Sequence, residues 1–147
     1  MSPNFKEVKK ILIPTDGSDY SMRAAEYAIG IAKTLNAEVT VVYVIDEVVL
    51  DQISKSSNRE SIEAELKEDG QRYIKYACSL AKKEGLKNSC VLAEGRPYEQ
   101  IVHLAKDLGI DLIVMGTYGR RGPERILIGS VAERVIEYAP CPVLVVK

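Results

Sequence analysis

Short apolar segments alternate along the chain with longer segments in which apolar residues recur every three or four positions. Five short segments rich in β-branched residues are typical of buried strands, and they cover residues 8–14, 37–45, 89–95, 111–116 and 142–147. The periodic segments predict four helices, over about residues 18–35, 60–85, 97–109 and 130–139. Because the strands alternate with helices of ten or more residues, the pattern predicts βαβ units and a parallel sheet.

The predicted fold class is α/β: an open five-stranded parallel sheet with helices on both faces, because nearly all-apolar strands require cover on both sides. Residues 1–147 form a single predicted domain without an internal boundary or repeat. Residues 46–60 interrupt the pattern and become polar toward their end, so we expect an exposed loop there. Ser18 or Asp19 is the expected N-cap of the first helix.

Composition and charge argue against several classes of partner and site. The formal net charge of −1 provides no global attraction to nucleic acid or to an anionic membrane. No apolar run approaches the roughly 20 residues of a membrane span, and the N-terminus has no signal-peptide core. The three cysteines, Cys78, Cys90 and Cys141, lack the C-x-x-C spacing of many zinc sites. We therefore expect free thiols and a cytoplasmic location.

The order of the strands decides which loops meet at a binding site. In an open α/β sheet, ligands bind beyond the carboxyl ends of the strands, where the strand order reverses. The order 3-2-1-4-5 would join the loop PTDGS (14–18) to GTYGRRG (116–122), whereas 2-1-3-4-5 would join it to EGRPY (94–98). Four of the ten glycines lie in residues 116–130, which favours the first order.

This glycine-rich segment has two interpretations. Glycine lets successive backbone N–H groups point at one anion, and the helix that follows Gly129 has free N–H groups that favour a phosphate. Alternatively, the segment is a flexible connection that ends in a helix cap. In keeping with these alternatives, Ser130 either caps the helix through its hydroxyl or donates that hydroxyl to a phosphate oxygen.

The charged residues near these loops also have two interpretations. Arg120, Arg121 and Arg125 either pair with phosphates or are simply solvated. Asp16, at the end of the first strand, would accept a ribose hydroxyl or bind a phosphate-associated Mg²⁺ through water. Its alternative role is an Asx-turn before the first helix.

The sequence contains no dedicated catalytic motif. It has neither a Walker A Gly-Lys-Ser/Thr nor a G-x-G-x-x-G after the first strand. The single histidine, His103, lies within a predicted helix, and no G-x-S-x-G occurs, so a hydrolytic triad has no support. The neighbouring carboxylates Asp46 and Glu47 are expected in a solvated loop, where they suggest no acid–base pair.

The spacing of the glycines gives the chain a family resemblance. Gly116, Gly119 and Gly129-Ser130 reproduce the pattern G-x2-G-x9-G-[S/T]. With ILIPTDGS near the start and CPVLVVK at the end, the chain resembles the ATP-binding branch of the universal stress protein family over essentially its whole length. The resemblance implies the strand order 3-2-1-4-5 and ATP, with Mg²⁺ or Mn²⁺, across the ends of the first and fourth strands. One departure is Tyr118, where relatives often carry histidine.

The resemblance also implies a set of nucleotide-binding residues. Pro14, Thr15 and Asp16 would flank adenine and ribose, Val44 would meet the adenine through its backbone, and Met115 would line the base pocket. The positions implied around the ribose and phosphates are Gly116, Gly119, Arg120, Arg121, Gly122, Gly129, Ser130 and Val131.

Finally, the resemblance implies an assembly and a function. Family members commonly dimerise through the last strand, here residues 142–147, and an apolar strand at a sheet edge needs such cover. The implied function is a cytoplasmic, nucleotide-dependent regulatory switch in the stress response. Two alternatives stay open. One is slow Mg-dependent ATP hydrolysis, with Asp16 on the metal and Arg121 on the phosphates, and the other is a nucleotide-free dimeric scaffold.

Overall fold

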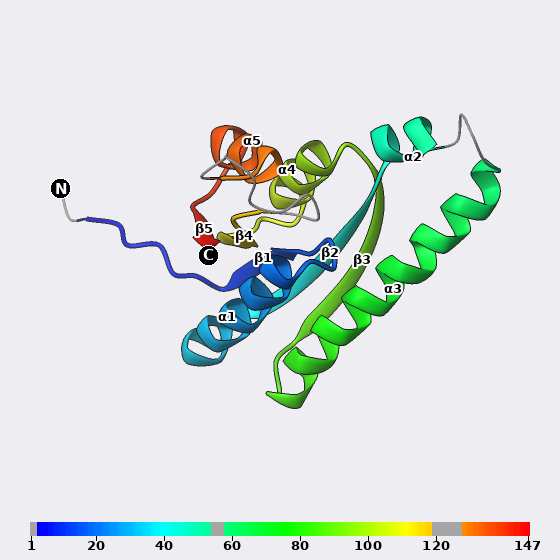
Figure 1. The fold of residues 1–147 in the computed structure, drawn as a ribbon. Helices are drawn as coiled ribbons and strands as arrows, with labels where there is room; N and C mark the ends of the chain where they lie inside the picture. Colours follow the sequence, from blue (N-terminus) through cyan, green and yellow to red (C-terminus); the bar gives the residue numbers. More distant parts are fainter. Residues whose placement is uncertain (1–2, 54–57, 119–127) are drawn as a thin grey trace.

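The computed structural model describes residues 3–53, 58–118 and 128–147 (Figure 1). The strands are β1 (Lys10–Pro14), β2 (Glu38–Asp46), β3 (Asn88–Gly95), β4 (Leu112–Gly116) and β5 (Val143–Val146). The helices are α1 (Asp19–Leu35), α2 (Glu47–Ile53), α3 (Arg59–Lys83), α4 (Pro97–Asp107) and α5 (Ser130–Tyr138). Within these described ranges, no helix has both the length and the apolar character needed to cross a membrane.

The five strands form one parallel sheet in the order β3-β2-β1-β4-β5. β1 is central, with Leu12 in register with Thr40 of β2 on one side and with Ile113 of β4 on the other. The predicted order 3-2-1-4-5 is therefore confirmed, and the alternative 2-1-3-4-5 is wrong. The carboxyl ends of β1 and β4 lie side by side where the strand order reverses, which is where such sheets bind ligands.

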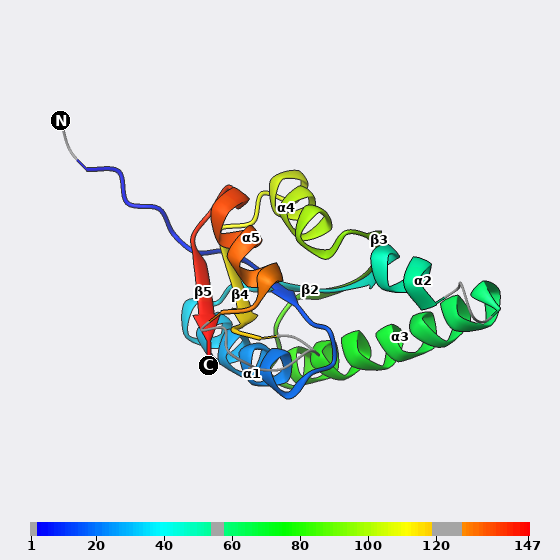
Figure 2. The ribbon, with the colours of Figure 1, turned by 45° about the horizontal axis from the view of Figure 1, so that its top comes forward.

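Helices cover both faces of the sheet (Figures 1 and 2). α1 and α3 lie on one face, and α4 and α5 lie on the other. Because consecutive strand residues point to opposite faces, β1 contributes to both cores. Ile11 and Ile13 belong to the hydrophobic cluster under α1 and α3, and Leu12 belongs to the cluster under α4 and α5. All three side chains are fully buried, as a central parallel strand requires.

Local signals in the sequence set the ends of α1. The Ser18 hydroxyl accepts a hydrogen bond from the backbone N–H of Ser21, so Ser18 is the N-cap and Asp19 is the first helical residue. At the other end Asn36 adopts the left-handed conformation, with φ of 54°, and its N–H donates to the carbonyl of Ala32. This conformation stops the helix and turns the chain into β2.

Residues 46–53 correct the expectation of an exposed loop, because they include a fifth helix, α2. Asp46 Oδ1 accepts the backbone N–H groups of Val48 and Val49, at 3.0 and 3.4 Å. Leu50 is fully buried and anchors the short helix to the protein. Arg59 at the start of α3 contacts the Asp51 carboxylate of α2 at 2.5 Å. α2 therefore depends on contacts with the rest of the fold, which short helices require.

The cysteines correct a second expectation. Cys78 of α3 and Cys90 of β3 form a disulfide with their Cα atoms 6.5 Å apart, so these two residues are not free thiols. Cys141 carries a free thiol, as predicted. It is partly buried, and burial, followed by the negative charge of Asp111, raises the pKa of this thiol. The disulfide joins the longest helix to an edge strand of the sheet.

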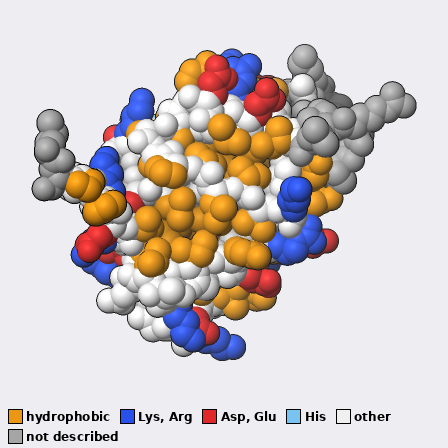
Figure 3. Space-filling model, turned by 90° about the vertical axis from the view of Figure 1, so that its left-hand side faces the viewer, with side chains coloured by type: hydrophobic (Ala, Val, Ile, Leu, Met, Phe, Trp, Pro, Cys, Tyr) orange, Lys and Arg blue, Asp and Glu red, His pale blue; other side chains and the backbone are white. Residues whose placement is uncertain are grey.

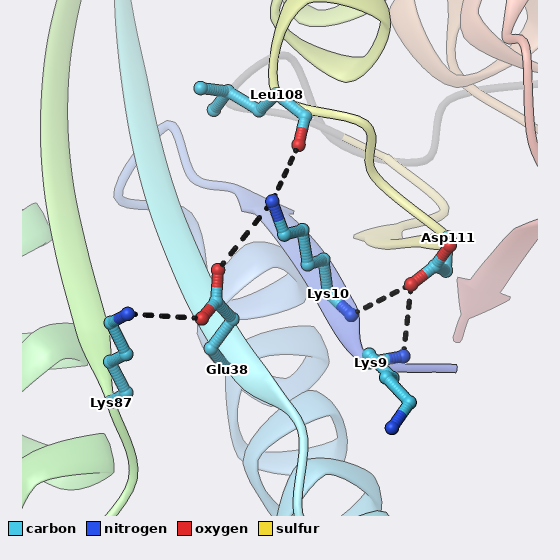
Figure 4. A network of polar contacts seen from close by, with 6 residues as sticks. All are labelled: Lys9, Lys10, Glu38, Lys87, Leu108 and Asp111. Atoms are coloured by element: carbon cyan, nitrogen blue, oxygen red, sulfur yellow. Dashed lines mark hydrogen bonds and ion pairs between the residues drawn. The ribbon is translucent and has the colours of Figure 1, made fainter. Parts of the chain in front are cut away.

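Polar contacts join the elements at the amino ends of the strands (Figure 4). Asp111 Oδ2 accepts the backbone N–H groups of Lys9 and Lys10, at 2.9 and 3.0 Å. The Lys10 ammonium donates to the carbonyl of Leu108 at 3.2 Å and lies 4.0 Å from Glu38 Oε1. These groups satisfy one another, which indicates a structural role for this end of the sheet.

Candidate nucleotide-binding site

A pocket of about 420 Å³ lies at the carboxyl ends of β1, β2 and β4. α5 begins at its edge, and residues of α2, α3 and α4 complete its wall. This is the end of the sheet, and the switch between β1 and β4, at which the sequence predicts a ligand. The volume falls within the range of small-molecule and cofactor sites.

The structure brings the described members of the predicted site together in this pocket. Its wall includes all nine of them, which are Pro14, Thr15, Asp16, Val44, Met115, Gly116, Gly129, Ser130 and Val131. The other four predicted residues, Gly119, Arg120, Arg121 and Gly122, lie outside the described residues, as does Arg125. Positions far apart in the sequence thus converge on one cavity.

Hydrogen bonds within the loop after β1 hold its polar side chains in place. The Thr15 and Ser21 hydroxyl oxygens are 3.0 Å apart in a buried pair, and Thr15 Oγ1 accepts the N–H of Gly17 at 3.3 Å. Asp16 Oδ1 accepts the N–H of Ser18 at 2.9 Å. The Asx-turn is therefore present, and Asp16 also lines the pocket. The turn fixes the carboxylate of Asp16 at the pocket edge.

Gly17 allows α3 to support this loop from behind. Its φ of 83° lies in the left-handed region that favours glycine. A Cβ atom at Gly17 would overlap the ring of Tyr73, which therefore packs directly against the loop backbone. The Tyr73 ring also lies 6.0 Å from the ring of Tyr43 on β2. α3 thus limits the movement of a loop that lines the pocket.

Thr117 connects the three elements on the other side of the pocket. Its backbone N–H and its hydroxyl both donate to the carbonyl of Val146 in β5, at 2.9 and 2.8 Å. Its own carbonyl accepts the N–H of Gly129, at 2.6 Å, immediately before α5. Gly116 beside it packs so closely against α1 that a Cβ atom would lie 2.8 Å from the backbone of Tyr20. Gly116 therefore allows α1 to pack closely against β4.

The N-terminus of α5 opens onto the pocket. Gly129 is the N-cap and provides no side-chain hydrogen bond, and Ser130 is the first residue of the helix. Of the two roles left open for Ser130, the helix cap is therefore not the one that the structure forms. Ser130 and Val131 line the pocket instead. The first N–H groups of a helix have no partner within it, and together with the helix dipole they favour an anion such as a phosphate.

An apolar wall lies opposite these polar groups. Val42 and Val44 of β2, Ile101 of α4 and Met115 of β4 line it, and all four belong to or pack against the hydrophobic cluster under α4 and α5. Such a surface suits a planar aromatic base, whose faces are apolar and whose edges form hydrogen bonds. The pocket therefore combines a place for a base with a place for an anion.

More than half of the residues in the pocket wall were not predicted from the sequence. The additional lining residues are Ser21, Val42, Tyr43, Asp46, Val49, Leu66, Pro97, Ile101, Thr117, Tyr118 and Ala132. Val42 and Asp46 were detectable in principle, since they lie two residues either side of Val44 and so share its face of β2. The half-buried position of Asp46 in the wall corrects the expectation that it lies in a solvated loop.

The described wall offers little for metal binding or acid–base catalysis. Its lining residues include two carboxylates, Asp16 and Asp46, and no histidine, lysine or arginine among those described. No group of three or more potential metal ligands occurs in residues 3–53, 58–118 and 128–147. His103 lies 3.0 Å from Asp107 on the exposed side of α4 and is not part of the wall.

Known proteins are similar to this chain in sequence and in fold. The universal stress protein MJ0531 of Methanocaldococcus jannaschii is 50% identical over 139 residues, which cover 95% of this chain and 82% of that protein. The solved structure of MJ0577, from the same organism, matches with a TM-score of 0.86 and 32% identity, covering 97% of each chain.

Two further matching structures contain nucleotides. A universal stress protein in complex with cAMP matches with a TM-score of 0.71 and 26% identity, over 97% of this chain and 99% of that one. One from Archaeoglobus fulgidus, in complex with dAMP, matches with a TM-score of 0.64 and 25% identity, over 95% and 98%. The model of the universal stress protein family matches residues 7–147. The chain belongs to the universal stress protein family.

Proposed function

We propose that this chain binds ATP in the pocket between β1, β4 and α5 and acts as a nucleotide-dependent regulatory switch. The observation that carries the proposal is the convergence of all nine described site residues on one pocket with an apolar wall and a helix N-terminus. The relatives that contain cAMP and dAMP support an adenine nucleotide. We further propose that the bound nucleotide is a triphosphate and that residues 1–147 form a single domain. The proposed role is in the stress response, in the cytoplasm.

Each part of the nucleotide has a suitable counterpart in the pocket. The base would lie against Val44 and Met115, and the ribose would lie near Asp16, whose carboxylate can accept a hydroxyl hydrogen bond. The phosphates would face the free N–H groups at Ser130 and Val131. This arrangement follows the polarity of the pocket, from the apolar wall to the start of α5.

A divalent cation fits this site as a companion of the phosphates. Asp16 is one of the two described carboxylates that line the pocket, and Mg²⁺ commonly binds one or two carboxylates together with phosphates and water. When bound, Mg²⁺ or Mn²⁺ would neutralise part of the phosphate charge. The described wall contains no histidine or lysine as a general base, which favours a binding role over dedicated catalysis.

The first experiment identifies the ligand. The freshly purified protein is denatured, and the released small molecules are identified by mass spectrometry. Calorimetric titration of the nucleotide-free protein with ATP, ADP, AMP and cAMP then ranks the affinities, with and without Mg²⁺. We expect saturable binding of adenine nucleotides, with ATP bound most tightly. Absence of binding by every nucleotide would contradict the proposal and favour the scaffold alternative.

Substitution of Ser130 tests the position of the phosphates. Aspartate at the first position of a helix interacts favourably with the helix dipole, so Ser130→Asp is expected to fold normally. Its negative charge would repel the phosphates and weaken ATP binding by about tenfold or more. Ser130→Asn is the neutral control, and adenosine, which lacks phosphates, is the control ligand. An equal loss of adenosine and ATP affinity in Ser130→Asp would contradict this placement.

We also propose that the protein is a homodimer through β5. β5 is the last strand of the sheet and has no described strand on its outer side. Figure 3 shows hydrophobic side chains gathered on the side of the molecule that carries β5, α1 and α5. Exposed hydrophobic residues on these elements include Tyr27, Leu35, Ile136, Tyr138 and Leu144. A second copy would cover this edge, which otherwise favours aggregation.

A further inference from the structure

Asp46 combines a structural contact with a position in the pocket wall. It is the last residue of β2, two positions after Val44, so both side chains lie on the same face of the strand. Both residues line the pocket, and two strand residues span about 6.6 Å. Asp46 therefore stands beside the wall position at which the proposed function places the base.

The start of α2 fixes the orientation of this carboxylate. Oδ1 accepts the N–H groups of Val48 and Val49. Among the described residues no donor contacts Oδ2, and Asp46 is only half-buried. One carboxylate oxygen is thus occupied by the protein, and the other is available to a ligand. The hydrogen bonds to Oδ1 thus hold Oδ2 of Asp46 as an acceptor in a fixed direction before a ligand binds.

We propose that Asp46 is the base-specificity residue of this site and accepts a hydrogen bond from the exocyclic amine of a 6-aminopurine. The inference rests on the proposed function, because it assumes that a nucleotide base occupies the pocket. An ionised carboxylate is an acceptor only. It pairs with the N–H of an amine at position 6, and it opposes the carbonyl oxygen that hypoxanthine and guanine carry there.

The unfavourable pairing of the Asp46 carboxylate with a carbonyl oxygen at position 6 sets the expected preference for ATP over inosine triphosphate. A site that hydrogen-bonds one ligand group rejects the analogue that leaves its polar group unpaired. Because Asp46 is half-buried, water can partly compensate for the lost pairing. We therefore expect ATP to bind at least about tenfold more tightly than inosine triphosphate, which differs from ATP by an oxygen in place of the amine.

The alternative is that Asp46 only caps α2. Asparagine is as good an N-cap as aspartate, so Asp46→Asn separates the two roles. With its Oδ1 on Val48 and Val49, the asparagine directs an NH₂ group toward the ligand. This group donates to a carbonyl oxygen at position 6 and no longer accepts from an amine. If Asp46 only caps the helix, the substitution leaves the base preference unchanged.

The test compares ATP with inosine triphosphate by calorimetric titration of the wild type, Asp46→Asn and Glu47→Gln. Glu47→Gln is the matched control, because it removes the neighbouring carboxylate charge on an exposed residue that does not line the pocket. We expect the ratio of the two affinities to fall by at least about tenfold in Asp46→Asn, toward equality or inversion, and to be unchanged in Glu47→Gln.

The outcomes distinguish this inference from the proposed function. A wild type that binds neither nucleotide contradicts both. A wild type that binds both equally, or an Asp46→Asn variant with the wild-type ratio, overturns the specificity role and leaves nucleotide binding intact. Should Asp46→Asn fail to fold, Asp46→Ser retains an N-cap hydroxyl and removes the second acceptor oxygen. It is expected to lose the preference for ATP without gaining affinity for inosine triphosphate.

Discussion

Two glycines within helices stand in opposite environments. Gly30 lies on the exposed side of α1, and a Cβ atom there would meet no other atom within 4 Å. Gly70 lies in α3, where a Cβ atom would overlap the ring of Tyr43 on β2. The same substitution, glycine to alanine, should therefore have opposite effects on stability.

We expect Gly30→Ala to raise the free energy of unfolding by about 0.5–1 kcal/mol, because alanine loses less backbone entropy in a helix. Gly70→Ala gains the same propensity but forces Tyr43 or α3 to move, which costs about 1–3 kcal/mol in a close-packed core. Urea unfolding of the two variants measures both effects. If the two changes in stability had the same sign, the close packing of α3 on β2 would be contradicted.

Individual roles within the site depend on hydrogen bonds that residue types do not determine. The sequence placed Asp16 and Ser130 at the site but left two roles open for each. In the structure, Asp16 forms the Asx-turn, and the N-cap of α5 is Gly129, not Ser130. Both roles depend on where the backbone turns, within one residue, and the sequence pattern does not locate helix ends that finely.

At the scale of elements, Thr117 joins β4, β5 and the start of α5. Replacing it with valine keeps the shape and both backbone hydrogen bonds but removes the hydroxyl donor to Val146. The Val146 carbonyl retains the N–H of residue 117, so we expect a loss of about 1 kcal/mol in the free energy of unfolding. Because Thr117 also lines the pocket, we expect weaker ATP binding as well.

Thr34→Val is the matched control for this prediction. Thr34 donates its hydroxyl to the carbonyl of Gly30 on the exposed side of α1, away from the pocket wall. Its substitution should change neither ATP affinity nor stability by more than a few tenths of a kcal/mol. Urea unfolding and calorimetric titration of both variants provide the comparison. Equal effects at the two positions would exclude a special role for Thr117.

The structural features that could not be predicted from the sequence depend on tertiary contacts. The strands and the four longer helices follow from hydrophobic periodicity, which each segment carries by itself. α2 has seven residues, too few for a clear period, and the burial of Leu50 and the cap at Asp46 hold it in place. Because residues 46–60 were interpreted as a loop, Asp46 was not predicted to line the pocket.

The disulfide was missed for a related reason. Cys78 and Cys90 are 12 residues apart, without a spacing that indicates a pair. They meet because α3 runs antiparallel to the strand that follows it and lies against the sheet beside β3, as Figure 1 shows. Pairing of this kind is a property of the packed helix and strand, and it becomes visible only once both are placed.

At the scale of the whole molecule, the two ends of the sheet have different roles. Ion pairs and hydrogen bonds join the elements at the amino ends, whereas a pocket opens at the carboxyl ends. The position of the pocket at the carboxyl ends was predictable, because parallel strands place the loops that follow them at a single edge of the sheet. The outer edge of β5 is the remaining feature at this scale, and it is the edge through which we propose that two copies of the chain associate.

The orientation of the β5 backbone allows a direct test of the proposed dimer. The carbonyls of Pro142 and Val146 accept hydrogen bonds from the N–H groups of Ile113 in β4 and of Thr117 just after it, and alternate residues of a strand point the same way. The N–H of Val145 therefore points outward, where a second copy would pair with it. Val145→Pro removes this donor without removing a bond to β4, and proline is tolerated at sheet edges.

We expect the wild type to sediment as a dimer in analytical ultracentrifugation and Val145→Pro to shift toward a monomer at the same concentration. Val145→Thr keeps the N–H and is the control for the loss of the valine side chain. Circular dichroism establishes that each variant is folded, so that dissociation is distinguished from unfolding. A monomeric wild type, or a folded Val145→Pro variant that remains dimeric, would place any association of this protein away from the β5 edge.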